Sequence, residues 1–241
     1  LSMQDKELTQ NRLKLAQACR ILFMEGLADY NLGHASFRVS GKELVCIKPQ
    51  GLGLEEVTPE DLIVIDFTGK KISGNHPAHG ENPIHIGIYK TRGDVGSVVH
   101  VHPVLATAFS SSDAALRPLN QEGVIFPRGV PVFESPELVT TEAQARSLAR
   151  TLGDESAVIL RNHGIVTVGP RIEEACLNAL FFEGALRIQR AAAQFGKIKA
   201  ISERTALKMY EQCRNPRRYD MIWNYLVRKL KRSGLALPDG S

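Results

Sequence analysis

Two histidines separated by one residue have the types and spacing for metal chemistry. His100 and His102 lie in the sequence VVHVHP, residues 98–103. β-branched residues favour a strand, and proline ends it. Because side chains alternate across a strand, both imidazoles leave the same face about 7 Å apart and can converge on one metal ion, with Val99 and Val101 facing the core. An isolated pair of this kind also fits two buried, hydrogen-bonded histidines.

A third histidine and a glutamate extend this pair to a candidate catalytic set. His163 lies in a turn between two apolar runs, where Asn162 and Gly164 tolerate unusual backbone angles. Three neutral histidines with one open position are typical of a catalytic zinc-type site. Glu81 precedes a helix that begins with proline, and its carboxylate could be a fourth ligand or a proton carrier. The structural alternatives are an ordinary turn residue for His163 and a helix-dipole preference for Glu81.

Length and composition favour a globular protein and argue against several other classes. The chain has 241 residues, of which 43% are hydrophobic and 23% charged, which is enough apolar material for a core. No apolar run reaches the roughly 18 residues of a transmembrane helix, and a signal-peptide pattern is absent. We therefore expect a cytoplasmic protein without a membrane partner, and four separated cysteines fit buried, reduced thiols. The net charge of +4 gathers near the C-terminus, where a solvated helical face explains it better than nucleic-acid binding.

The elements that must position these residues follow from hydrophobic spacing. Helices are predicted at about 5–27, 83–92, 104–110, 140–152, 172–195, 202–212 and 217–232. Strands are predicted at 35–39, 44–47, 62–66, 98–103, 157–160 and 165–168, with a weak strand near 124–126 and a brief helical turn at 58–61. This order predicts an α/β fold in a single domain, residues 4–241, with a helical C-terminal extension at about 200–232.

Several motifs occur here in an order shared by one protein family. Glu81, the strand that ends at Pro103 and the turn at 162–164 resemble the acid/base, metal and third-ligand motifs of the class II aldolase/adducin family. Supporting segments also match, namely GHASFR at 33–38, KPQG at 48–51, VTPEDL at 57–62 and the Ile88-Tyr89 pair. The resemblance covers about residues 8–200. It implies a three-layer α/β/α sandwich around a mostly antiparallel sheet.

The resemblance also implies a role for each residue of the candidate set. His100, His102 and His163 would bind one divalent ion per chain, most commonly zinc, with manganese, cobalt or iron as alternatives. Glu81 would be the catalytic acid/base. The ion would hold two adjacent substrate oxygens and stabilise the enediolate-like state that aldol cleavage and decarboxylation share.

Family members usually assemble as homotetramers with sites between subunits. The resemblance therefore implies a second copy of this chain as a partner. Tyr219 and Tyr225, in the C-terminal region, are candidates for a residue that one subunit contributes to the site of another.

The positions that bind phosphate in the sugar-phosphate aldolases and epimerases of the family carry different residues in this chain. Their Asn, their Thr-Gly or Ser-Gly pair and their Ser-Ser pair correspond here to His34, Gln50-Gly51 and His79-Gly80. These substitutions resemble the branch that decarboxylates hydroxylated aromatic or pyridine carboxylic acids. We therefore predict a metal-dependent carbon–carbon lyase acting on a hydroxyaryl carboxylate, with His34, Gln50, Gly51 and His79 as substrate contacts.

Other functions remain open at this stage. An aldolase that cleaves a hydroxy-ketone or sugar phosphate is the main alternative, followed by an adducin-like interaction module and an Fe(II) oxygenase, because histidine ligands alone do not fix the metal. His34 could instead hydrogen-bond its own loop, and His79 could tune the proton affinity of Glu81 or be solvated. His85, one helical turn beyond Glu81, is a candidate hydrogen-bond partner for a metal ligand.

Overall fold

The computed structural model describes residues 3–237, so the predicted domain end at 238–241 lies outside the described residues. Its helices are α1 (Met3–Met24), α2 (Asn82–Thr91), α3 (Val104–Ser110), α4 (Glu142–Leu152), α5 (Ile172–Gln194), α6 (Glu203–Cys213) and α7 (Pro216–Arg232), with the 3-10 helix η1 (Gly123–Ile125). Its strands are β1 (His34–Arg38), β2 (Leu44–Ile47), β3 (Ile63–Asp66), β4 (Lys71–Ser73), β5 (Ser97–Val101), β6 (Val132–Phe133), β7 (Ala157–Leu160) and β8 (Gly164–Gly169).

A single sheet connects these strands in the order β4-β3-β2-β1-β5-β8-β7-β6. Neighbouring strands are antiparallel except β6 and β7, which are parallel. The strand that carries the first histidine is central, because β5 pairs with β1 on one side and β8 on the other. His34 lies opposite His100 in the first ladder, and Val101 lies opposite Ile165 in the second. The sheet therefore brings segments 34, 100 and 163–165 together at one end of β5.

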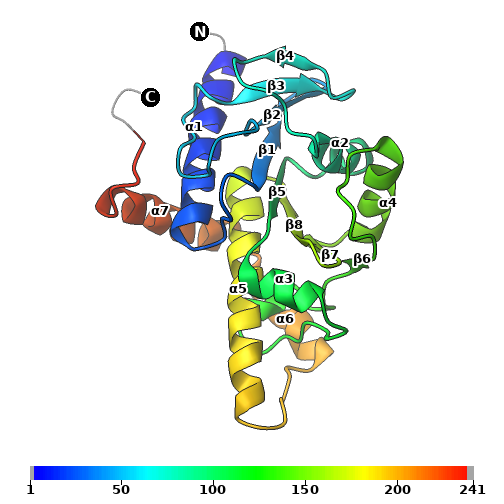
Figure 1. Ribbon diagram of the computed structural model, residues 1–241. Coiled ribbons are helices and arrows are strands. Elements are labelled where there is room, and N and C mark those ends of the chain that lie inside the picture. Colours follow the sequence, from blue (N-terminus) through cyan, green and yellow to red (C-terminus); the bar gives the residue numbers. More distant parts are fainter. Residues whose placement is uncertain (1–2, 238–241) are drawn as a thin grey trace.

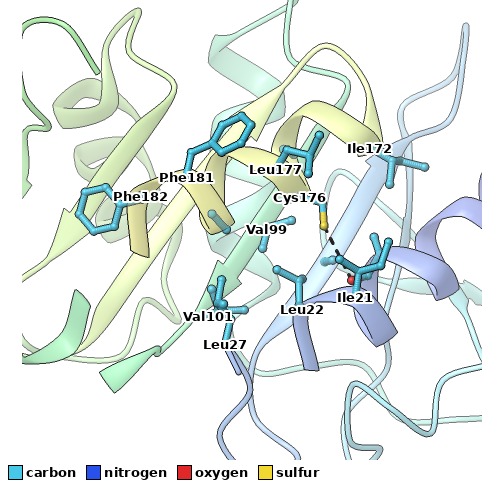
Figure 2. Packing of buried hydrophobic residues seen from close by; sticks show 14 of the residues in the cluster. Ile21, Leu22, Leu27, Val99, Val101, Ile172, Cys176, Leu177, Phe181 and Phe182 are labelled. Atoms are coloured by element: carbon cyan, nitrogen blue, oxygen red, sulfur yellow. Dashed lines mark hydrogen bonds between the residues drawn. The ribbon is translucent and has the colours of Figure 1, made fainter. Parts of the chain in front are cut away.

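Helices cover both faces of this sheet (Figure 1), which confirms the predicted three-layer α/β/α sandwich. On one face, α1 and α5 enclose a core that includes Val99 and Val101 (Figure 2). On the other face, α2 and α4 enclose a second core, to which β5 contributes Val98. The alternation predicted for β5 is thus confirmed, because His100 shares its face with Val98.

The contact between α1 and α5 illustrates how helical spacing builds the larger core. Ile172 and Cys176 are one turn apart on α5 and face Ile21 and Leu22 of α1 (Figure 2). The thiol of Cys176 lies 3.9 Å from the carbonyl oxygen of Ala18. Side chains with these spacings interlock along the two helices, and the buried apolar surface fixes the layer behind β5.

The cysteines and the helices are relevant to the predicted cytoplasmic location. All four cysteines are free and buried, as predicted. Burial raises the pKa of the Cys19 and Cys46 thiols to about 12, so both stay protonated and unreactive at neutral pH. None of the helices among residues 3–237 is long and apolar enough to cross a membrane. The cytoplasmic location stays a prediction.

Four local predictions were wrong or incomplete. The weak strand near 124–126 is the 3-10 helix η1, and residues 58–61 form only a turn. The Asp61 carboxylate closes that turn by accepting hydrogen bonds from the backbone N–H and hydroxyl of Thr58, and β3 follows directly, so no helix can propagate. Strands β4 and β6 were not predicted, because the first is exposed throughout and the second has two residues.

Candidate active site

Four side chains from separate elements meet at the end of β5. His100 belongs to β5, His102 follows it, His163 lies in the turn between β7 and β8, and Glu81 immediately precedes α2. One ring nitrogen from each histidine lies within 4.8 Å of the other two. The Oε2 atom of Glu81 lies 3.9 Å from Nε2 of both His100 and His163. The predicted metal and acid/base residues are therefore brought together.

The hydrogen bonds of two of these histidines show that the cluster fits a cation. Nδ1 of His100 donates to the carbonyl oxygen of Ile165 at 2.9 Å, and Nδ1 of His102 donates to both carboxylate oxygens of Asp29 at 3.0 Å. A neutral ring that makes such a bond carries its one proton on Nδ1, so its Nε2 offers a lone pair. These two Nε2 atoms lie 2.9 Å apart. Facing lone pairs repel at that distance, and a positive ion between or beside them removes the repulsion.

Burial favours the neutral form, which metal binding requires, in His100, in His163 and in the neighbouring His79. It lowers the pKa of His100 well below its usual value, and the neighbouring histidines act in the same direction. It also lowers the pKa of His163 to about 4 and that of His79 to about 4. All three rings are therefore unprotonated at neutral pH and can offer a lone pair without first releasing a proton.

Glu81 has the surroundings of a proton carrier. Burial raises its pKa, and a hydrogen bond from the backbone N–H of Val139 to Oε1 at 3.0 Å opposes that effect. The bond to Val139 also fixes the carboxyl group, so that Oε2 faces the histidine cluster. A carboxyl group whose pKa is shifted towards neutrality both accepts and returns a proton more readily than an exposed one.

The turn that carries His163 depends on two small or polar neighbours for different reasons. Asn162 has φ of 57°, a left-handed conformation of the kind that asparagine tolerates in a turn. Gly164 does not have a positive φ. Its role is steric, because a Cβ atom there would lie 2.6 Å from Cδ2 of His102 and 2.6 Å from the carbonyl oxygen of Val101. Glycine thus allows β8 to pass close to the metal-binding histidines.

A cleft of about 900 Å³ opens onto this cluster. His102, His163 and Glu81 line its inner end. Three of the four predicted substrate contacts also line it, namely Gln50, Gly51 and His79. Apolar side chains that are exposed to solvent lie around the same cleft: Leu32, Val104 and Leu138. The cleft therefore combines polar groups near the histidines with apolar walls, as small-molecule sites commonly do.

Comparison with known proteins identifies the family of the chain. Residues 13–190 match the family described as Class II Aldolase and Adducin N-terminal domain. The chain belongs to this class II aldolase and adducin family. The match runs from within α1 to most of α5 and includes Glu81 and all three clustered histidines.

Class II aldolase relatives resemble the chain over most of its length. A 3,4-dihydroxyphthalate decarboxylase of Terrabacter sp. is 31% identical over 201 residues, which cover 78% of this chain and 84% of the relative. An aldolase II superfamily protein from Pseudomonas syringae superposes with a TM-score of 0.86 at 30% identity, covering 98% of this chain and 96% of the other. An L-fuculose-1-phosphate aldolase from Thermus thermophilus superposes with a TM-score of 0.66 at 30% identity. The match covers 79% of this chain and 99% of the aldolase.

The fourth predicted substrate contact, His34, does not line the cleft of this family member. Its side chain is fully buried, and its ring centroid lies 4.2 Å from that of His79. Nδ1 of His34 lies 2.6 Å from Nε2 of His85. His85, the candidate partner for a metal ligand, contacts His34 and Ser36 rather than one of the three clustered histidines.

The two tyrosines proposed to reach another subunit differ in exposure. Tyr219 is 3% exposed, and its hydroxyl donates to Oδ1 of Asn178 in the same chain at 2.9 Å. It is thus part of this chain's own core, and its predicted contribution to a neighbouring site was wrong. Tyr225 is half exposed and stays a candidate.

Sequence reasoning did not find two residues that support the site. Asp29 holds His102 from a position 73 residues away in sequence. Lys48 is fully buried, and its Nζ atom donates to the carbonyl oxygens of Asn31 at 3.2 Å and Pro49 at 3.3 Å. These bonds tie together the two loops that line one side of the cleft. The sequence showed Lys48 only as the first residue of the KPQG segment at 48–51, without indicating what its side chain contacts.

Proposed function

We propose that the chain is a divalent-metal-dependent carbon–carbon lyase that decarboxylates a hydroxylated aromatic carboxylate. The observation that carries the metal dependence is the 2.9 Å approach of the Nε2 atoms of His100 and His102, whose rings are each fixed by a hydrogen bond from Nδ1. The choice of reaction is supported by the 31% identity with the 3,4-dihydroxyphthalate decarboxylase of Terrabacter sp.. A decarboxylase and an aldolase among the relatives both support lyase chemistry.

In this proposal His100, His102 and His163 hold one divalent ion. Zinc suits three imidazoles with an open position, and manganese, cobalt or iron are alternatives. The ion supplies positive charge that stabilises the negative charge developing on substrate oxygens. An ortho hydroxyl and carboxylate on an aromatic ring present two oxygens at the spacing of a chelate.

Glu81 acts as the proton donor and acceptor of the proposed reaction. Decarboxylation breaks the bond between the ring carbon and its carboxylate, releases carbon dioxide and leaves the bonding electron pair on the ring carbon, which must then take up a proton. The Oε2 atom of Glu81 faces the cluster and can deliver this proton, while the Val139 N–H keeps Oε1 in place. The carboxylate then recovers a proton from solvent through the cleft, whose lining includes Glu81.

The cleft walls suit a flat, partly apolar substrate. Leu32, Val104 and Leu138 offer apolar contacts for a ring, and Gln50 and His79 offer hydrogen bonds to its polar edge. Bulky imidazole and amide groups stand where sugar-phosphate aldolases place smaller groups around phosphate. We retain Gln50, Gly51 and His79 as proposed substrate contacts.

Elemental analysis and turnover test the proposal. We expect about one divalent ion per wild-type chain and loss of that ion in the His102→Ala variant. The matched control is His76→Ala, because His76 is half-buried beside Asp61 and does not line the cleft. The metal-loaded protein should release carbon dioxide from 3,4-dihydroxyphthalate. A folded wild-type protein that takes up no metal would refute the proposal and favour an adducin-like interaction module.

The second candidate function is aldol cleavage. It is favoured by the 30% identity with the L-fuculose-1-phosphate aldolase of Thermus thermophilus. Turnover of L-fuculose 1-phosphate without release of carbon dioxide from 3,4-dihydroxyphthalate would establish it in place of decarboxylation. Oxygen uptake with iron, but not with zinc or manganese, would instead indicate the Fe(II) oxygenase alternative.

A further inference from the structure

Four buried side chains form a hydrogen-bonded chain behind the candidate active site. The phenol oxygen of Tyr89 lies 2.7 Å from Oγ of Ser36, which lies 2.6 Å from Nδ1 of His85. Nε2 of His85 lies 2.6 Å from Nδ1 of His34. His34 and Ser36 are two residues apart on β1, and His85 and Tyr89 are four apart on α2, so each pair shares one face of its element. The chain thus links strand to helix and ends at the cluster.

The direction of the protons in this chain can be deduced from its far end. Among the described residues, the Tyr89 hydroxyl has Ser36 as its only side-chain hydrogen-bond partner. A buried hydroxyl proton needs an acceptor, so Tyr89 donates to Ser36. Ser36 must then direct its own proton to the lone pair on Nδ1 of His85.

The same reasoning fixes the proton of each ring that follows. His85 accepts at Nδ1, so its proton is on Nε2, from which it donates to Nδ1 of His34. The proton of neutral His34 is consequently on its own Nε2. Both rings are neutral in this arrangement, because Nδ1 of His85 and Nδ1 of His34 each accept a hydrogen bond and so carry no proton.

His34 therefore presents an N–H donor with nothing to receive it. Its Nε2 is buried and has no hydrogen-bond partner among residues 3–237. A ring nitrogen of His34, a carboxylate oxygen of Glu81 and a ring nitrogen of His100 all lie within 4.8 Å of one another. One oxygen atom can span that separation with two hydrogen bonds of about 2.8 Å each. A buried unpaired donor is costly, which favours an oxygen acceptor in this position.

We propose that the Tyr89–Ser36–His85 chain is a positioning device that keeps a proton on Nε2 of His34. In this arrangement His34 is not a metal ligand, although it lies among residues that could ligate. Its N–H instead holds an oxygen atom beside the Glu81 carboxylate, within the centre of the lyase function proposed above. That oxygen belongs either to the substrate or to a water molecule that serves Glu81.

The first test measures the proton directly and needs no substrate. Histidine labelled with ¹⁵N in the zinc-loaded protein gives two-bond ¹H–¹⁵N correlations that distinguish a protonated Nε2 from a protonated Nδ1. The His34→Gln variant assigns the His34 signals by their loss. We expect the Nε2–H form for both His34 and His85 in the wild type. A protonated Nδ1 on His34 would overturn the proposal.

The second test separates a donor from a ligand. The His34→Ala variant should retain about one zinc ion per chain, whereas His102→Ala should lose it. His34→Gln keeps an N–H donor near the same position, and His76→Ala is the control for loss of an unrelated histidine. Loss of zinc from both folded His34 variants would show that His34 is a ligand and would overturn the proposal.

The third test identifies the oxygen that His34 holds. With 3,4-dihydroxyphthalate, His34→Ala should lower kcat/KM about 10- to 100-fold, the loss expected for a hydrogen bond to a charged group, and His34→Gln should recover most of it. If His34→Ala raises KM, the oxygen that His34 holds belongs to the substrate. If His34→Ala lowers kcat and leaves KM unchanged, that oxygen belongs to the water molecule that serves Glu81. Unchanged kinetics in His34→Ala would overturn the proposal. If the wild type does not turn over this acid, the decarboxylase proposal fails, and the labelling and zinc measurements still decide the role of His34.

Discussion

At the scale of single residues, the contact between Asp29 and His102 defines what the second histidine can do. Both carboxylate oxygens lie 3.0 Å from Nδ1, so the ring is held in one orientation and its Nε2 is directed at the cluster. A carboxylate in this position also increases the basicity of the imidazole towards a metal. His100 receives equivalent support from a backbone carbonyl, which carries no charge.

Removing this carboxylate should weaken the metal site without destroying it. We expect Asp29→Ala to lower zinc affinity about 10- to 100-fold, because the histidine loses its hydrogen-bonded partner. Competition with a chelator measures the dissociation constant. Asp113→Ala is a matched control, since Asp113 is exposed and does not line the cleft. Equal affinities for the two variants would contradict the role assigned to Asp29.

Glu81 offers a second prediction at this scale. Glu81→Gln keeps the size of the side chain but removes the exchangeable carboxyl proton. We expect zinc to be retained and kcat for the decarboxylation to fall about 10²- to 10⁴-fold, the contribution typical of a general acid or base. Loss of zinc from this variant would indicate a ligand rather than a proton carrier, and an unchanged kcat would remove Glu81 from the reaction.

At the scale of elements, the approach of β8 to the residue after β5 sets the geometry of the cluster. Gly164 begins β8, and its missing side chain lets the strand pass His102 at a distance that a Cβ atom would not permit. Gly33 has a similar role before β1, because its φ is 73° and a Cβ atom there would lie only 3.3 Å from the carbonyl oxygen of His100. Gly33 and Gly164 thus allow both neighbouring segments to pass close to the end of β5.

Adding one methyl group at this contact should disturb the metal site. Gly164→Ala would force β8 and His102 apart, and we expect a loss of about 1–3 kcal/mol in the free energy of unfolding together with weaker zinc binding. Gly93→Ala is the matched control, because a Cβ atom there meets nothing within 4 Å and its φ is not in the left-handed region. Urea unfolding and zinc titration measure both effects. Identical behaviour of the two variants would show that the approach is not constrained.

At the scale of the whole molecule, buried histidines link stability to pH. Burial lowers the pKa of His34, His85 and His100 in the folded chain, whereas the unfolded chain takes up protons near the usual value of 6.5. Below pH 6.5 the unfolded state therefore binds more protons than the folded state, and the free energy of unfolding falls as pH falls. Glu81 and Glu183 act in the opposite sense, because burial raises the pKa of both.

The histidines should dominate this balance in the metal-free protein. We expect its free energy of unfolding to decrease from pH 6.5 down to about pH 3, where His85 takes up its proton in the folded chain, as measured by urea unfolding at a series of pH values. In the His85→Gln variant, the free energy of unfolding should depend less steeply on pH, by the contribution of about one proton, since the pKa of His85 is about 3 in the folded chain. A slope that the substitution leaves unchanged would mean that His85 is protonated in the folded state.

The apolar rim of the cleft bears on assembly. Val104 is 80% exposed and Leu138 is 59% exposed in the isolated chain, and apolar groups grouped in this way commonly meet another surface. We retain the prediction of a homotetramer with sites near subunit contacts. Light scattering after size-exclusion chromatography should give close to four times the 26.5 kDa of one chain. A monomer at micromolar concentration would contradict this prediction.

The sequence by itself determined the parts of this protein that depend on neighbouring residues. Alternation along β5 placed His100 and Val99 on opposite faces, the residues Asn162 and Gly164 placed His163 in a turn, and helical spacing located the α-helices to within a few residues. Motif order was sufficient to recognise the family, which the comparison confirmed. Each of these features arises from backbone periodicity or turn preference within a short segment.

Only the tertiary structure decided which distant residues support the site. The contact of Asp29 with His102 spans 73 residues, and that of His34 with His85 spans 51. Both follow from strand pairing and from the packing of α2 on the sheet, which no local pattern encodes. The proton on His34 is set by three further side chains, because a buried donor must find an acceptor and each bond constrains the next.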